Sequence, residues 1–462
     1  MNKNIQLGIG FATGRKSFRK VLKTYVFNWR ECGLSERKDI GLNLLVAYDL
    51  KYSNTKPEDY KEIKKEVLDL IDNVYFIGKD EMKAEVQHLV NKNVINNNET
   101  WIFGSGYAAQ RNSILYTAIK NNIDYLIFLD DDEYPLAVTR TRPNVVWSGQ
   151  HVIRTHLRYI RQADITHGYH CGYVSPIPYV EFNSVLTEND FAMFIEAISN
   201  DIINWDSIRM IMNNGGITYA DTQVLTSEAV KEVKEVNHCK FISGGNLCIN
   251  LTDPLRVKPF YNPPGARGED TFLSACLGEH KVMRVPCYTF HDGFFTYNHL
   301  LDGVLPISLR CVEADSEQFI TRFYNACIGW IRYKPLLLYI TQRNVYEDKI
   351  ELMRQQLSET LPKICNYFNR NEFMNIAIEL DKYHRNVKKH YMEFLEIQRI
   401  WAKICNYLYS NNGRASKLLK TENIAEYMTR DFHRKKTVRS QYTKIRGRYN
   451  YSDKVKHVTT MK

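Results

Sequence analysis

The sequence from Asp124 to Pro135 reads Asp-Tyr-Leu-Ile-Phe-Leu-Asp-Asp-Asp-Glu-Tyr-Pro. Its apolar part, residues 125–129, is short and rich in strand-forming residues, which predicts a strand buried on both faces of a sheet. Three aspartates, Asp130, Asp131 and Asp132, follow this strand directly. Because open α/β sheets bind ligands beyond the carboxyl ends of their strands, we expect the three carboxylates to lie at a ligand site. An exposed acidic turn is the alternative interpretation.

The three carboxylates also predict a metal site. Adjacent carboxylates repel one another, and each raises the pKa of its neighbours. A hard divalent cation with oxygen ligands would offset this repulsion and would in turn bind the phosphates of a substrate. We therefore expect a divalent cation, rather than a solvated turn, at the end of this strand.

Strand and helix patterns alternate on both sides of the acidic stretch. Strands are predicted over residues 5–11, 42–48, 74–77, 165–174, 241–251 and 282–285. Helices are predicted over residues 18–29, 57–71, 82–90, 108–120, 151–161, 190–212 and 271–277, whereas residues 139–148 are polar and irregular. Such alternation predicts an α/β fold with a mainly parallel sheet and right-handed crossovers.

The pattern changes beyond Val312, where prolines and glycines become rare and helical periodicity dominates. Apolar residues recur every three or four positions from Ile376 to Leu408, as in one long helix packed against residues 319–340 or against a second subunit. We therefore expect a catalytic domain over residues 1–311, a helical C-terminal domain over 312–425 and a tail over 426–462. A homo-oligomer formed through the C-terminal helices is one expectation.

The net charge of +10 is concentrated in the tail, where eleven Lys and Arg residues follow Thr429 against only Asp431 and Asp453. Such a tail could bind nucleic acid, contact an anionic membrane surface, or remain a solvated segment. The chain shows neither a long apolar run nor an apolar signal core, and its ten cysteines form no Cys-x-x-Cys pair. We expect a cytoplasmic protein with reduced thiols, with peripheral contact at the inner face of the membrane as an option.

Several short motifs suggest a family. The stretch from Gly106 to Asn112, followed by a helix and the acidic strand, resembles the GT-A glycosyltransferases, nearest to the family 2-like inverting group. The resemblance covers residues 5–300, and its motifs occur in the family's order: Asp130-x-Asp132, Ser243-Gly244-Gly245-Asn246, Gly268-Glu269-Asp270 and His291. It implies a GT-A fold with a Rossmann-like, nucleotide-diphospho-sugar-binding sheet.

The resemblance also implies an activity in glycan biosynthesis, the transfer of a hexosyl or N-acetylhexosaminyl group. The expected donor is a UDP-sugar such as UDP-glucose or UDP-N-acetylglucosamine. The expected acceptor is a hydroxyl group of a glycan, a lipid-linked glycan or a protein. By the same resemblance, Asp132 and His291 would hold Mn²⁺ or Mg²⁺, and Asp270 would be the general base, with Glu269 assisting acceptor binding. A carboxylate base implies inversion at the anomeric carbon, although retention stays open.

A nucleotide-sugar pocket is expected around the ends of the first strands. Gly10, Phe11 and Thr13 would line it after the first strand, and Asp49 after the second. Further residues assigned to it are Asp130 near the ribose, Asp131 with less weight, the glycine loop at Gly244 and Gly245, and Arg111 near the nucleotide. Arg111 could equally be a helix-surface residue.

Two other functions remain open from the sequence. A sugar-nucleotide pyrophosphorylase has a related α/β sheet, but the continuation after Gly14-Arg15-Lys16 lacks its glycine-rich signature. Free UDP as product would indicate a transferase, whereas pyrophosphate exchange would indicate a pyrophosphorylase. The second alternative is a nucleic-acid-binding protein that acts through the basic tail.

Overall fold

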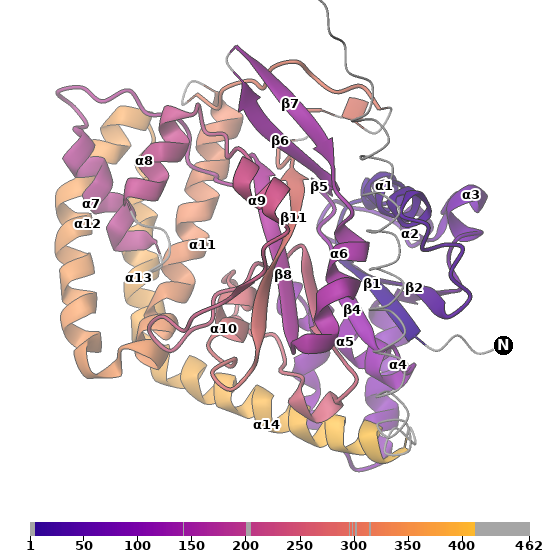
Figure 1. Cartoon of the computed structure of the whole chain (residues 1–462). Coiled ribbons are helices and arrows are strands. Elements are labelled where there is room, and N and C mark those ends of the chain that lie inside the picture. The colour runs from indigo at the N-terminus through magenta and orange to yellow at the C-terminus, as the bar shows by residue number, and fades with distance from the viewer. Residues whose placement is uncertain are drawn as a thin grey trace, which may run out of the picture. The chain divides into compact units, whose positions relative to one another are not determined.

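A mixed β-sheet lies at the centre of the fold (Figure 1). Its strands are β1 (Ile5–Thr13), β2 (Ile40–Tyr48), β3 (Asn73–Ile77), β4 (Tyr125–Phe128), β5 (Glu133–Tyr134), β8 (Ile165–Gly172), β9 (Lys231–Glu232), β10 (Leu247–Asn250) and β11 (Val282–His291). They are ordered β3-β2-β1-β4-β10-β8-β11-β5, with β9 paired to β11. The strands β3, β2, β1 and β4 are parallel, whereas β10 runs antiparallel to both of its neighbours. The α/β class is therefore confirmed, but the sheet is mixed rather than mainly parallel.

The structure is a computed structural model of the chain, and it describes residues 5–141, 143–199, 205–294, 296–297, 299–300, 303–313 and 316–411. The chain divides into two compact units, Met1–Leu408 and Tyr409–Lys462. The basic tail predicted over 426–462 lies outside the described residues. Among the helices that are described, none combines the length and the apolar character needed to cross a lipid bilayer.

The predicted acidic strand is β4, all of whose residues are buried. Helices of the N-terminal half flank the strands: α1 (Phe18–Glu31), α2 (Glu58–Lys61), α3 (Lys65–Leu68), α4 (Lys79–Asn91), the 3₁₀ helix η1 (Asn97–Phe103) and α5 (Tyr107–Lys120). The apolar face predicted for α1 is buried, from Phe18 to Trp29. The helix predicted over 57–71 is instead two short helices, because Glu62 adopts a non-helical backbone conformation (φ −77°, ψ 72°).

The middle of the chain departs most from the sequence prediction. Its elements are the strands β6 (Leu136–Thr141) and β7 (Asn144–Gly149), the helices α6 (Val152–Tyr159), α7 (Glu188–Ile198), α8 (Trp205–Asn213), α9 (Thr222–Ser227) and α10 (Glu269–Ser274), and the 3₁₀ helices η2 (Ile160–Gln162) and η3 (Pro254–Arg256). The segment predicted as irregular, 139–148, lies in the antiparallel hairpin of β6 and β7. The helix predicted over 190–212 is two helices, and the strand predicted from 241 begins only at Leu247, after the paired glycines.

The C-terminal region is helical, as predicted. It comprises α11 (Glu317–Thr341), η5 (Arg343–Val345), α12 (Tyr346–Phe368), η6 (Asn371–Met374), α13 (Asn375–Arg385) and α14 (Val387–Asn411). The single long helix expected from Ile376 is broken at Asn386 (φ −97°, ψ 3°). Helix α14 contacts the α/β region directly, because Trp401 Nε1 donates a hydrogen bond of 3.0 Å to the carbonyl oxygen of Val257.

Glu99 anchors α14 to η1. Its side chain is buried, accepts hydrogen bonds from Lys403 Nζ (2.7 Å) and from the amide of Asn96 (3.0 Å), and also pairs with Arg399. Although burial opposes ionisation, the hydrogen bonds from Lys403, Asn96 and Arg399 lower the pKa of Glu99 to about 2. The contribution of ionised Glu99 to the free energy of unfolding is therefore fully present above the ordinary pKa of 4.5, and it is lost as the pH falls toward 2.

Glu99→Gln should therefore lower the free energy of unfolding by about 2 kcal/mol near neutral pH, because two basic groups lose their shared carboxylate. Urea denaturation monitored by circular dichroism measures this change. Glu359→Gln, at an exposed position on α12, should change the same quantity by less than about 0.5 kcal/mol. Equal effects of the two substitutions would show that Glu99 does not anchor α14.

Candidate active site

The aspartate cluster lies where the strand order of the sheet reverses. The chain proceeds from β1 outward to β2 and β3, and then returns to place β4 on the other side of β1. Open α/β sheets bind ligands at such a switch point. Residues at and just after the end of β1 contact the aspartates. The hydroxyl of Thr13, the last residue of β1, donates a hydrogen bond to Asp131, and Arg15 Nη1 lies 2.8 Å from Asp131 Oδ1 and 3.1 Å from Asp132 Oδ2.

His291, the last residue of β11, lies against Asp132. The distance from His291 Nε2 to Asp132 Oδ1 is 3.5 Å, and the main-chain amide of Asp292 donates to the carbonyl oxygen of Asp132 at 2.9 Å. His291 Nδ1 is 2.7 Å from the carbonyl oxygen of Tyr173. Because a carbonyl oxygen can only accept, Nδ1 carries a hydrogen, so the lone pair of the neutral ring is on Nε2 and faces Asp132.

This pair fits a divalent cation that is completed by other oxygen ligands. A metal-binding histidine typically donates its second ring N–H to a carbonyl or carboxylate, as His291 does. Within the described ranges, no three His, Cys, Asp or Glu side chains are grouped so that they could enclose a metal ion. Asp132 and His291 would therefore supply two ligands, and phosphate oxygens and water the others, as is usual for Mg²⁺ and Mn²⁺.

Arg111 links the aspartate cluster to the second predicted acidic motif. Its Nη1 donates to the carbonyl oxygen of Gly244 at 2.8 Å, its Nη2 lies 3.3 Å from Asp130 Oδ1, and its Nε lies 3.4 Å from Glu269 Oε1. The guanidinium group lies against the rings of both Phe128 and Phe260, with its carbon 5.0 Å and 5.4 Å from the ring centres. The side chain is only 5% exposed. It therefore joins the two acidic motifs from within the protein and is not a surface residue.

Asp270 is held at the start of α10. Its Oδ2 accepts a hydrogen bond from the amide of Gly244 (3.1 Å), and its Oδ1 accepts one from the amide of Thr271 (2.8 Å). Burial raises the pKa of Asp270 to about 6, and the adjacent Glu269 adds to this effect while Arg111 opposes it. A carboxylate with a pKa near 6 can exchange a proton close to neutral pH, as a general base requires.

The paired glycines allow the backbone to approach both groups of acids. A Cβ atom at Gly245 would lie 2.8 Å from Asp130 Oδ2, and one at Gly244 would lie 3.1 Å from Arg111 Nη2. The absence of a side chain at both positions thus allows close approach to charged side chains. From the sequence we assigned these glycines to the nucleotide-sugar pocket. The structure places them between the Asp130–Asp132 cluster and the Glu269–Asp270 pair.

A buried ion pair, which the sequence did not indicate, lies next to the aspartate cluster. Glu133 Oε1 lies 3.0 Å from His170 Nδ1, and Thr289 Oγ1 donates to Glu133 Oε2 at 2.9 Å. Although burial opposes its ionisation, the His170 partner holds the pKa of Glu133 below its ordinary value. The charge of Glu133 in turn adds to the effect of burial in raising the pKa of Asp130 to about 8.

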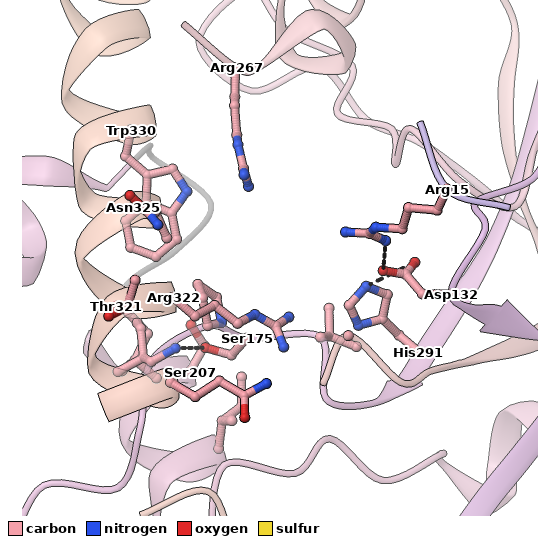
Figure 2. Close-up of a pocket in the computed structure, with 18 of the residues that line it drawn as sticks. Arg15, Asp132, Ser175, Ser207, Arg267, His291, Thr321, Arg322, Asn325 and Trp330 are labelled. Carbon is pink, nitrogen blue, oxygen red and sulfur yellow. Dashed lines mark hydrogen bonds and ion pairs between the residues drawn. The ribbon is translucent and has the colours of Figure 1, made fainter. Parts of the chain in front are cut away.

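A cavity of about 690 Å³ opens beside Asp132 and His291 (Figure 2). The two residues and Arg15 line one side, and Arg267, Arg322 and Trp330 line another. This volume is within the range of small-molecule sites. Asp270 is not among the lining residues and connects to the cluster through Gly244 and Arg111. Arg322 had no distinguishing signal in the sequence, because it occurs within an ordinary amphipathic helix.

The other residues assigned to the nucleotide pocket lie at or below the same edge of the sheet. The ring of Phe11 is fully buried and packs on Phe18, so it lies in the core rather than in the cavity. Thr13 is also buried, where it holds Asp131. Asp49 follows β2, and its amide donates to the carbonyl oxygen of Thr13 at 2.9 Å. Tyr52 was not predicted, and it lines the cavity with its hydroxyl group 3.3 Å from Arg15 Nη2.

Comparison of the chain with protein-family models and with curated proteins finds no match.

Proposed function

We propose that the chain is a metal-dependent GT-A glycosyltransferase that transfers a hexosyl or N-acetylhexosaminyl group from a nucleoside-diphosphate sugar, preferably a UDP-sugar, to an acceptor hydroxyl. The observation that carries the proposal is the pairing of His291 Nε2 with Asp132 at 3.5 Å, at the switch point of the sheet. The parallel strands β3-β2-β1-β4 and the antiparallel β10 are consistent with the GT-A interpretation.

Such a transfer would require a metal site and a general base, which different residues would provide. Asp132 and His291 would hold Mn²⁺ or Mg²⁺, which when bound supplies positive charge to the diphosphate of the donor. The acceptor oxygen attacks the anomeric carbon and forms the new glycosidic bond. The bond from that carbon to the phosphate oxygen breaks, and the diphosphate leaves with the electron pair. Asp270 takes the proton of the acceptor hydroxyl, and a single displacement of this kind inverts the anomeric centre.

The raised pKa of Asp270 predicts an acid limb in the pH profile. A base must be deprotonated to act, so kcat/KM should fall about tenfold per pH unit below pH 6 and level off above it. Glu269 and Arg111, which face Asp270, both influence where this limb lies. Initial rates between pH 4.5 and 8 with saturating metal measure the limb. A profile that is flat from pH 5 to 7 would exclude Asp270 as the base.

A donor screen tests the proposed function directly. The full-length chain would be incubated with Mn²⁺ and a panel of UDP-, GDP- and TDP-sugars, and release of free nucleoside diphosphate would be measured with and without EDTA. We expect EDTA-sensitive release from at least one donor, most strongly from a UDP-sugar. Formation of labelled nucleoside triphosphate from the donor and added labelled pyrophosphate, without diphosphate release, would instead identify a pyrophosphorylase. NMR of the product would then determine the anomeric configuration.

A further inference from the structure

The cavity has an excess of positive charge. Within the described ranges its lining contains three arginines, Arg15, Arg267 and Arg322, and one acid, Asp132. Arg15 pairs with two carboxylates, Asp131 and Asp132, so three arginines face two acids and the net charge is 3 − 2 = +1. A divalent cation and the diphosphate diester of a nucleotide sugar would cancel one another in charge. Binding the donor and its metal therefore leaves the excess in place, and a second anionic group would be needed to offset it.

Arg322 contributes to this excess from α11. Its Nη2 donates to the carbonyl oxygen of Tyr173 at 3.3 Å, but its buried Nη1 has no hydrogen-bond partner in the described part of the chain. The guanidinium carbon lies 3.9 Å from the centre of the Phe294 ring. Burial lowers the pKa of Arg322 to about 10; Asp132 opposes this effect, whereas Arg267 adds to it. A buried, unpaired donor of this kind is costly unless a ligand satisfies it.

Arg267 reaches the cavity from the loop that precedes the proposed base. Its aliphatic stem lies against α11, since a Cβ atom at Gly329 would be 3.3 Å from Arg267 Cδ. Only Gly268 and Glu269 separate it from Asp270. Figure 2 shows the guanidinium groups of Arg267 and Arg322 directed toward the middle of the cavity. A segment of two residues therefore joins Arg267, which lines the cavity, to Asp270, the proposed base.

We propose that the acceptor is an anionic sugar or a similar polyol, and that its carboxylate or phosphate group binds Arg267 with Arg322 alongside. Planar guanidinium groups suit both kinds of oxyanion, which they bind through charge-assisted hydrogen bonds. Ser175, Ser207 and Asn325 line the same side of the cavity and offer polar groups to sugar hydroxyls, and Trp330 offers a ring surface. This inference rests on the proposed function, and it narrows the acceptor to a charged class.

Three matched sugars test the inference without donor turnover. Glucose, glucuronate and glucose 6-phosphate share a ring and differ in bearing no charge, a carboxylate or a phosphate. Their affinities for the full chain, with Mn²⁺ and UDP present, would be measured by isothermal titration calorimetry. We expect at least one of the anionic sugars to bind at least about tenfold more tightly than glucose. Comparison of glucuronate with glucose 6-phosphate then shows whether a carboxylate or a phosphate is preferred.

The arginine is then tested by substitution. Arg267→Gln should reduce the preference for the anionic sugars to less than about threefold, and should weaken UDP binding far less. Arg385→Gln, at an exposed position on α13, should leave the preference intact. The inference would be overturned if all three sugars bound with equal affinity or if none bound detectably. It would also be overturned if Arg267→Gln weakened the binding of UDP rather than that of the anionic sugars. Failure of the proposed function would be seen separately, because no nucleoside diphosphate would then be released from any donor in the nucleotide-sugar screen.

Discussion

Replacing Asp132 by alanine should abolish metal-dependent release of nucleoside diphosphate, with a loss of at least about two to three orders of magnitude in kcat. Asp132 contacts both Arg15 and His291 and also lines the cavity. Its removal would eliminate the carboxylate ligand of the cation and the charge stabilisation of the leaving diphosphate, and the loss of such electrostatic contacts usually has this size. A coupled assay for UDP release across a Mn²⁺ titration measures the effect.

A matched control separates this effect from a general loss of fold. Asp348→Ala, at an exposed position in the first turn of α12, also removes one carboxylate and should leave the release rate within about twofold of the wild type. Circular dichroism melting of both variants checks that they are folded. A near-normal rate for Asp132→Ala, or a wild-type rate that EDTA does not change, would contradict the assigned metal site.

Asp270→Asn should lower the transfer rate by about two to four orders of magnitude, the usual range for loss of a general base. The amide oxygen of Asn can still accept the hydrogen bond that Asp270 accepts from the amide of Gly244, although the bond from the amide of Thr271 is lost, so the local structure should be largely retained. The amide cannot take a proton from the acceptor. Affinity for UDP with Mn²⁺, measured by calorimetry, should therefore change by less than about threefold.

The pH dependence of the residual activity of Asp270→Asn provides a second test of the role of Asp270. The acid limb near pH 6 should disappear from the residual activity of Asp270→Asn, because the group that titrates there has been removed. An equal loss of UDP binding and transfer would show that Asp270 holds the Gly244 loop and is not the base. A limb that persists unchanged would assign the titration to another group.

The local elements of the sheet could be predicted from the sequence because their signals are short-range. The apolar run before Asp130 forms β4 with all of its residues buried, and the amphipathic periodicity after Phe18 forms α1. The β6 and β7 hairpin was not predicted, because its outward-facing polar residues resemble a loop and its pairing joins Leu136 to Gly149 across the turn. Helix breaks at Glu62 and Asn386 depend on backbone conformation, and apolar periodicity continues through both.

The site was predictable only where the resemblance brought distant residues together. The motifs placed Asp132 and His291 in one site, and the structure brings them into contact. The carbonyl of Tyr173, which sets the orientation of the His291 ring, had no signal, because any residue offers a carbonyl. Arg111 was left open between a nucleotide contact and a surface position, and its buried side chain lies against Phe128 and Phe260. Such long-range packing has no local pattern.

The most direct test of the account is the position of the cation. Crystals of the full chain grown with UDP and MnCl₂ would be measured at a wavelength where manganese scatters anomalously. We predict one manganese peak bonded to Asp132 and to His291 Nε2, within about 2.3 Å of each, with diphosphate oxygens completing its coordination. A fully occupied peak that contacts neither residue, or UDP bound away from the edge of the sheet at β1 and β4, would contradict the assignment.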